Sequence, residues 1–264
     1  MEIQIKRAVK AGNSSAVILP RAWLNKEVRV ELIKKDHKII LSEVIHILTK
    51  YLDLSNVISI YLTGSYARGD ESKDSDIDIL VITKDHGREA IQEGMYNILL
   101  VSEKLLQQKL KSDLLPIGQM IKEGKPLLNS KFLENIKIKV TKDNVKWYLN
   151  TTEDKLRIIE KALQNNKTKT SKISDSLAYT LVLRIRTLYI IKKLIESKSY
   201  FKKDFIQIIK SISKSDNPYK SYLTIKQDEK DNYQTSLNEV ERLYKYLKKQ
   251  LSEIKGLIKQ KSSQ

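Results

Sequence analysis

The chain has 264 residues, with 49 Lys or Arg against 32 Asp or Glu, and its formal net charge is +17. It contains no Cys, which excludes a disulfide framework and a thiolate metal site and agrees with a reducing cytoplasm. No apolar run approaches the roughly 18–20 residues that span a bilayer, and the charged start lacks the apolar core of a signal peptide. We therefore expect a cytoplasmic protein of two or three domains, without a membrane partner.

The positive charge is concentrated at the two ends of the chain. Residues 1–41 carry a net charge of +5, residues 42–140 of −1 and residues 141–264 of +13. Strong positive charge attracts nucleic acid through its phosphates, although Lys-rich helix faces in solvent explain the C-terminal excess equally well. We predict three domains with these same boundaries.

The first forty residues show the pattern of a small β domain. The stretch EIQIKRAV alternates as a strand does, KAGNSS at 10–15 is a turn, AVILP at 16–20 is a short strand, and VRVELIKKDHKIIL at 28–41 predicts a hairpin. Four short strands bury too little apolar surface on their own, so we expect this domain to dimerise or dock.

A family resemblance lies in the run RAVKAGNSSAVILPRAWL followed by VRVELI. It resembles the AbrB/SpoVT swapped-hairpin family, whose members form intertwined dimers that usually bind DNA. The resemblance implies a homodimer and makes Arg7, Lys10, Asn13 and Arg21 candidate DNA contacts. In the alternative interpretation, Asn13 only serves the turn and the domain only dimerises.

From Ser42 the apolar spacing becomes helical, with Ser42 as the N-cap. VISIYLT at 57–63 is a β-branched run typical of a buried strand, and Gly64 and Ser65 follow it. Glycine lets the backbone approach an anion closely, and amides at the start of a helix point toward that anion. Arg68 lies one turn further on. These residues predict a phosphate-binding turn.

The segment DIDILVI, ten residues after the Gly-Ser pair, predicts a metal site. In a strand, Asp76 and Asp78 project from the same face of the sheet. Two carboxylates without Lys or Arg between them suit a hard divalent cation that shares oxygen ligands with nucleotide phosphates. Asp74 precedes the apolar run, and we expect it in the loop.

The run GSYARGDESKDSDIDILV is similar to the DNA polymerase β-like nucleotidyltransferases, especially to the minimal nucleotidyltransferases of prokaryotes, which often pair with helical HEPN proteins. The resemblance implies that Gly64 and Ser65 hold a nucleoside triphosphate, with ATP expected, and that Asp76 and Asp78 are catalytic and bind Mg²⁺. An acceptor hydroxyl then attacks the α-phosphate and pyrophosphate leaves. A toxin–antitoxin connection follows from the same resemblance.

One position departs from that family's pattern. The family supplies a third carboxylate from a later strand, and the corresponding segment MYNILLVSE at 95–103 carries Asn97 there, with Glu103 beyond the strand. Two functions therefore stay open. The intact motifs favour a metal-dependent nucleotidyltransferase acting on an unidentified acceptor hydroxyl, whereas Asn97 favours a non-catalytic DNA-binding regulator that senses nucleotide.

The rest of the chain predicts helices, with a turn at 124–128 and a helical bundle from Asp143 onward. The bundle resembles the HEPN or kanamycin nucleotidyltransferase C-terminal type, with tyrosines in its core. HEPN ribonucleases need a His after an Arg, but His37, His46 and His86 all precede the bundle, which excludes that activity. The expected fold class is α+β: a swapped-hairpin domain, a polymerase β-like α/β domain and a helical bundle.

Overall fold

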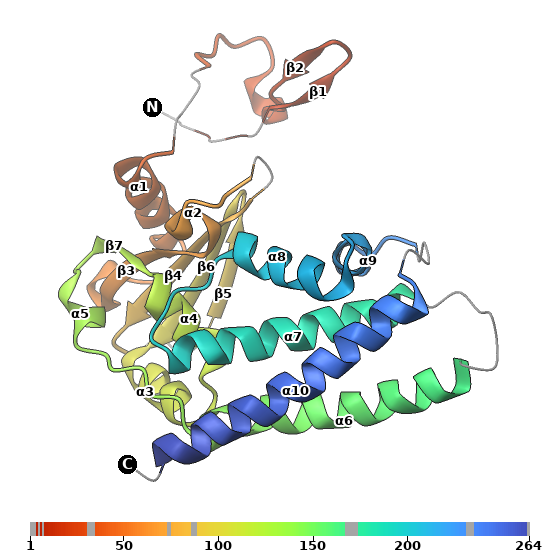
Figure 1. Cartoon of the computed structure of the whole chain (residues 1–264). Coiled ribbons are helices and arrows are strands. Elements are labelled where there is room, and N and C mark those ends of the chain that lie inside the picture. The colour runs from red at the N-terminus through yellow and green to blue at the C-terminus, as the bar shows by residue number, and fades with distance from the viewer. Residues whose placement is uncertain are drawn as a thin grey trace.

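The computed structural model describes residues 4, 6, 8–30, 35–72, 75–85, 89–166, 174–230 and 235–262, with the backbone alone for residues 165, 166, 261 and 262. It has an N-terminal β-hairpin, a mixed sheet with helices on both faces, and a group of long helices beside the sheet (Figure 1). The predicted α+β class is confirmed.

A five-stranded sheet lies at the centre, in the order β5-β6-β4-β3-β7. β4 is parallel to β6, and the other neighbours are antiparallel. The strands are β3 (Val57–Thr63), β4 (Ile77–Thr83), β5 (Glu89–Glu93), β6 (Tyr96–Ser102) and β7 (Lys125–Leu128). β3 and β4 are nearly continuous apolar runs because helices cover both of their faces.

Successive side chains of β4 point to opposite faces of the sheet. Ile77 and Ile79 pack with α1 (His37–Leu48) on one face. Leu80 and Ile82 pack on the other face with α3 (Glu103–Ser112) and α4 (Leu115–Glu123). Asp78 lies two residues before Leu80 in the strand, so its carboxylate points to the same face, which α3 and α4 cover.

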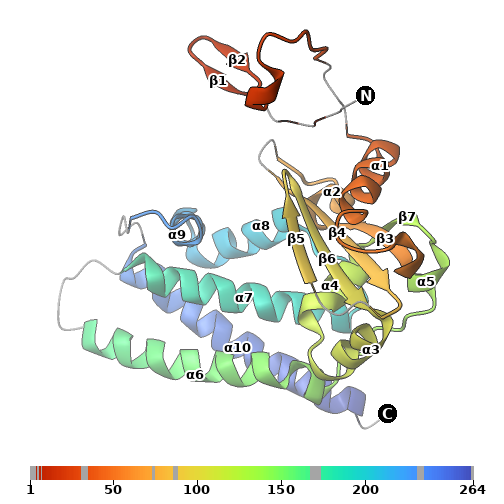
Figure 2. The same cartoon turned by 180° about the vertical axis from the view of Figure 1, so that it is seen from behind.

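The N-terminal hairpin contributes nothing to this core. β1 (Val9–Ala11) pairs with β2 (Ser14–Ala16), and a 3₁₀ turn follows at Arg21–Trp23. None of residues 8–30 is buried, and Figures 1 and 2 both place the hairpin beyond α1, apart from the sheet and the bundle. The strand predicted at 16–20 is therefore wrong beyond Ala16, because no strand in the described part of the chain pairs with residues 17–20.

The hairpin predicted at 28–41 is also wrong, because α1 begins at His37. Asp36, and not Ser42, is its N-cap, and the Asp36 side chain accepts a hydrogen bond from the Ile39 amide at 2.8 Å. The cap satisfies an amide that the first helical turn leaves without a partner. Residues 37–41 then extend the apolar stripe that packs against the sheet.

A third difference concerns residues 124–128, predicted as a turn. They include β7, whose Lys125 pairs with Leu62 of β3 in antiparallel register. Two residues before Lys125 and two residues after Leu62, Glu123 at the end of α4 lies beside Gly64 at the start of α2 (Gly64–Arg68). This strand pairing brings two segments together that lie 59 positions apart.

The C-terminal half is helical, as predicted. α6, α7 and α10 run side by side, α9 packs against α7, and α8 packs against α10 and lies nearer the sheet than α9 does (Figures 1 and 2). The helices are α5 (Lys131–Glu134), α6 (Lys142–Asn166), α7 (Asp175–Ile195), α8 (Lys202–Ser213), α9 (Asn217–Lys226) and α10 (Leu237–Ser262). Within the described ranges, no helix is both long and apolar enough to cross a membrane.

Candidate active site

The two predicted metal ligands lie at the start of β4 beside Asn97. Asp78 pairs directly with Asn97 across the parallel β4–β6 ladder, so both side chains lie on the same face. Asp76 is exposed, and the Asn97 Nδ2 atom donates to its Oδ2 atom at 3.3 Å. Asn97 therefore lies beside both aspartates, at the position where the sequence comparison expected a third carboxylate.

Glu103, the other candidate for the third carboxylate, lies far from the aspartates. Ser102 pairs with Thr83 at the opposite end of the ladder, and Glu103 follows as the exposed first residue of α3. Glu103 lies six positions after Asn97 along an extended segment, a distance of roughly 20 Å. Among the described residues, no group of three or more His, Cys, Asp and Glu side chains has metal-binding geometry.

The close approach of Asp78 depends on Gly64. Gly64 has φ +66°, and a Cβ atom built on it would lie 2.0 Å from the Asp78 Oδ2 atom. Burial raises the pKa of the Asp78 carboxyl above its ordinary value, and hydrogen bonding from Asn97 opposes this rise. The negative charges of Asp76 and Glu123 raise the pKa further. A cation placed between the aspartates would relieve this repulsion.

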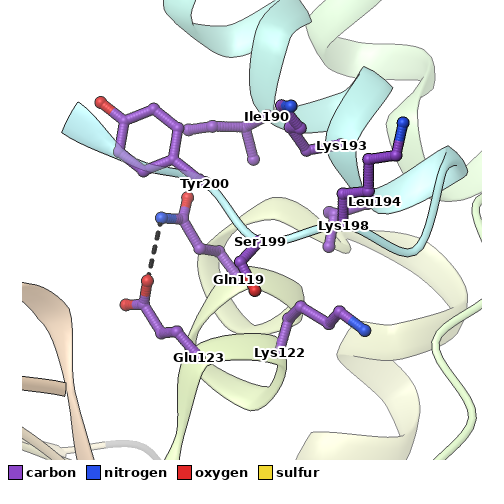
Figure 3. A pocket seen from close by; sticks show the side chains of 9 residues that line it. All are labelled: Gln119, Lys122, Glu123, Ile190, Lys193, Leu194, Lys198, Ser199 and Tyr200. Atoms are coloured by element: carbon purple, nitrogen blue, oxygen red, sulfur yellow. Dashed lines mark hydrogen bonds between the residues drawn. The ribbon is translucent and has the colours of Figure 1, made fainter. Parts of the chain in front are cut away.

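A small cavity lies beside the site, between α4 and the end of α7 (Figure 3). Its volume is about 10 Å³, which is room for no more than about one water molecule. Gln119 and Glu123 line it from α4, and the Gln119 Nε2 atom donates to a carboxylate oxygen of Glu123 at 3.2 Å. The cavity is too small for a nucleotide.

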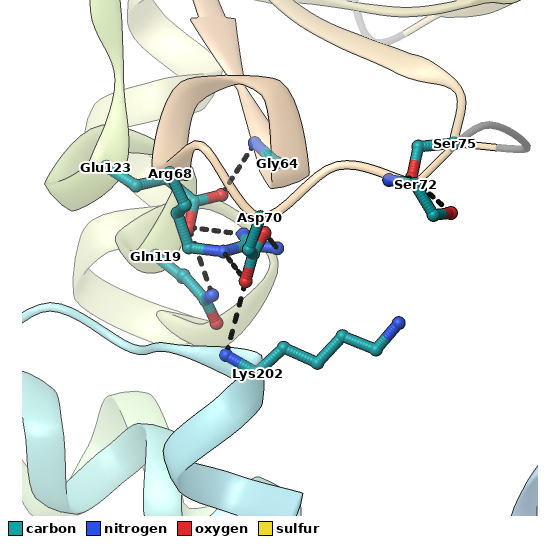
Figure 4. Close-up of polar contacts among 8 residues, drawn as sticks. All are labelled: Gly64, Arg68, Asp70, Ser72, Ser75, Gln119, Glu123 and Lys202. Carbon is teal, nitrogen blue, oxygen red and sulfur yellow. Dashed lines mark hydrogen bonds and ion pairs between the residues drawn. The ribbon is translucent and has the colours of Figure 1, made fainter.

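Glu123 occupies the anion-binding end of the predicted phosphate turn (Figure 4). The Gly64 amide donates to Glu123 Oε1 at 2.8 Å, and the Arg68 Nη1 atom donates to Glu123 Oε2 at 2.8 Å. Arg68 also forms an ion pair with Asp70 at 3.1 Å. Arg68 thus has two carboxylate partners already. The sequence analysis missed Glu123, because only the β3–β7 pairing brings it to the turn.

Ser65 differs from its neighbours in this turn. Its side chain is partly exposed and makes no hydrogen bond to another residue in the described part of the chain. The Ser65 hydroxyl is therefore available to a ligand, whereas the Gly64 amide is already bonded to Glu123. The arrangement can present two carboxylates and an amide to a cation, next to a free hydroxyl and the backbone of a short helix.

The sequence around this site is similar to one protein family. Residues 41–143 match the family model described as "Nucleotidyltransferase domain". This part of the chain is therefore similar to that family. No curated protein matches the sequence, and the comparisons confirm neither the AbrB/SpoVT nor the HEPN resemblance.

One solved structure similar to the chain is a nucleotidyltransferase-like protein from Exiguobacterium sibiricum 255-15. The two sequences are 13% identical and the TM-score is 0.37. The similarity covers 81% of this chain and 75% of that chain.

Bundle residues reach the nucleotidyltransferase domain through Tyr200. Its ring is 5% exposed, and the guanidinium carbons of Arg68 and Arg186 each lie 5.6 Å from the ring centroid. The backbone amide of Lys202 donates to Asp70 at 3.3 Å, as Figure 4 shows. The bundle therefore packs directly against the turn that carries Ser65, a relation that no local sequence motif indicated.

The candidate DNA contacts lie away from this site. Arg7 is outside the described residues. Lys10 is in β1, Asn13 is in the turn before β2, and Arg21 begins the 3₁₀ turn. All three are exposed on the hairpin segment, which lies apart from the sheet that carries Asp76 and Asp78 (Figures 1 and 2).

Proposed function

We propose that the chain is a metal-dependent nucleotidyltransferase that moves a nucleoside monophosphate from a nucleoside triphosphate, ATP being our first choice, to an acceptor hydroxyl. The observation that carries the proposal is the meeting of Asp76, Asp78 and Asn97 beside the Gly64–Ser65 turn, within residues that match the nucleotidyltransferase family model.

The donor set fits a hard divalent cation such as Mg²⁺, because carboxylate and amide oxygens are the ligands it prefers. We propose that Asp76 and Asp78 hold the metal. When bound, Mg²⁺ supplies positive charge at the reacting phosphate. Ser65 receives a phosphate oxygen on its free hydroxyl, and Gly64 keeps the turn open to Asp78. Arg68 reaches a phosphate only after one of its two carboxylate partners has moved.

A second candidate function is a non-catalytic regulator that binds nucleotide. Two observations favour it: Asn97 stands where the family has a carboxylate, and the charge of Arg68 is already balanced by Glu123 and Asp70. In that case the domain binds a nucleoside triphosphate with Mg²⁺ and transfers nothing.

For the N-terminal segment we propose dimerisation, with DNA contact through Lys10, Asn13 and Arg21 and with Arg7 beside them in the sequence. Exposed apolar side chains support dimerisation: Ile18 is 70%, Leu24 72% and Val30 71% exposed. Such residues are commonly covered by a partner. A toxin–antitoxin role stays a hypothesis.

The decisive experiment incubates the full chain with each α-labelled nucleoside triphosphate and Mg²⁺, with and without a cell extract. We expect label transfer by the wild type and its loss in both Asp76→Asn and Asp78→Asn. If both variants transfer label as well as the wild type does, the metal site is contradicted. Binding of a labelled nucleotide without any transfer favours the regulator.

A further inference from the structure

Arg186 of α7 is a poorly satisfied cation. Its Nε atom is buried without a hydrogen-bond partner, its Nη1 atom makes a long contact of 3.4 Å to the Tyr222 hydroxyl, and its other polar neighbour is the Tyr200 phenol. Within the described ranges it forms no ion pair with an Asp or Glu. Partial withdrawal of a guanidinium from water without an anionic partner costs free energy, and a bound anion would offset that cost.

The two arginines that contact Tyr200 differ in this respect. Arg68 has two carboxylate partners, Glu123 and Asp70, whereas Arg186 has phenols alone, Tyr222 and Tyr200. Because both guanidinium carbons lie 5.6 Å from one ring centroid, they are at most about 11 Å apart. Arg186 therefore offers an unbalanced positive charge close to the turn that carries Ser65.

The groups around Arg186 are donors that suit an anion. Tyr219 and Tyr222 stack with ring centroids 5.7 Å apart on α9, which packs against α7. Burial raises the pKa of Tyr219 to about 12, so this phenol keeps its proton at neutral pH. Arg186 and Tyr219 are both only partly buried, so a ligand can reach them from solvent.

We propose that Arg186, together with the hydroxyls of Tyr219 and Tyr222, binds a phosphate group of a substrate. The choice of phosphate rests on the proposed nucleotidyltransferase function. The guanidinium fork matches phosphate oxygens in a bidentate manner and the phenols add hydrogen bonds. The phosphate belongs either to the nucleoside triphosphate or to a phosphate-bearing acceptor, and the experiment separates these sources.

The test compares Arg186→Met with Arg184→Met in the full chain. Arg184 is a matched control on the same helix: its Nε atom is also buried without a partner, but its Nη1 atom donates to Thr151 of α6. We titrate ATP with Mg²⁺, and inorganic phosphate in the presence of saturating ATP. Loss of a charge-assisted contact predicts at least about tenfold weaker binding of one of these probes to Arg186→Met.

Each outcome decides something. Weaker ATP binding assigns the triphosphate, and weaker binding of inorganic phosphate beside an unchanged ATP affinity assigns an acceptor phosphate. Equal affinities of Arg186→Met and the wild type for both probes overturn the site, as do equal losses in Arg184→Met. The site is also overturned if the wild type binds neither ATP nor inorganic phosphate.

A folding defect and a failure of the proposed function are both distinguishable. Melting curves check that Arg186→Met is folded, and Tyr222→Phe, which removes one hydroxyl, repeats the test if it is not. If the wild type binds inorganic phosphate through Arg186 without binding any nucleoside triphosphate, the anion site stands and the proposed function fails. If label transfer is normal and neither affinity depends on Arg186, the proposed function stands and the anion site fails.

Discussion

The central sheet region and the N-terminal hairpin differ in how far their apolar side chains are buried. The sheet buries its own, and Ile79, Leu80 and Val81 have no exposed surface. The hairpin segment leaves Ile18 and Leu24 more than two-thirds exposed. A sheet with helices on both faces is stabilised by its own sequence, whereas a two-stranded hairpin alone is marginal in water. The comparison predicts that activity and stability depend on the first region and assembly on the second.

Gly64→Ala should have the largest effect. The added Cβ atom would meet the Asp78 carboxylate at 2.0 Å, so Asp78 must move out of line with Asp76. We expect label transfer to fall by at least about 100-fold, because small displacements of catalytic groups cost factors of this order.

The matched control for this substitution is Gly69→Ala. Gly69 also has a positive φ, of +73°, but a Cβ atom there has nothing within 4 Å. The control therefore shares the backbone strain without the collision with Asp78. Equal losses of transfer in the two variants would show that backbone strain, rather than the Asp78 contact, explains the effect.

Deleting residues 1–30 tests the other half of the comparison. We expect the mass in solution to fall from that of a dimer to that of a monomer, while label transfer stays within about threefold and the melting temperature moves by a few degrees at most. None of residues 8–30 is buried, so their loss opens no cavity. Sedimentation and calorimetry measure both quantities, and a collapse of the melting temperature would mean that the hairpin supports the sheet.

Asn97→Asp should sharpen the account of the active site. It adds a carboxylate beside Asp76 and Asp78, and general-base assistance is typically worth about 10²–10⁴ in rate. A slow wild type should therefore gain transfer activity. Gln92→Glu is the control, because Gln92 pairs with Asn97 from β5 and its charge lies one strand further from Asp78. A gain of equal size in both variants would indicate a general charge effect.

The smallest effect concerns stability. The pKa of Asp78 is raised mainly by burial, so the folded protein is favoured when this carboxyl is protonated, and that contribution is lost as pH rises through the raised pKa. Without metal at pH 7, Asp78→Asn should melt a few degrees above the wild type. The difference should shrink as pH falls toward the pKa of Asp78. A lower melting temperature at pH 7 would show that the carboxylate stabilises the fold.

Local patterns predicted much of the candidate active site. The apolar run at 57–63, the Gly64–Ser65 corner and the alternation around Asp76 and Asp78 indicated a strand, a turn and a pair of carboxylates, and the register agrees. The placement of Asn97 beside Asp76 also agrees. The N-terminal prediction was less accurate, since the strand predicted at 16–20 ends at Ala16 and a helix begins at His37 inside the hairpin predicted at 28–41.

By itself, the sequence determined the elements whose signal is local: the alternation of β4, the helical spacing of the bundle and the glycine before Ser65. Tertiary structure alone decided which anion the Gly64 amide binds, because Glu123 reaches it only through the antiparallel pairing of Lys125 with Leu62. It likewise decided that Arg68 is balanced by carboxylates, whereas Arg186 has no carboxylate partner among the described residues. Charge balance depends on distances between segments remote in sequence, and chain folding sets those distances.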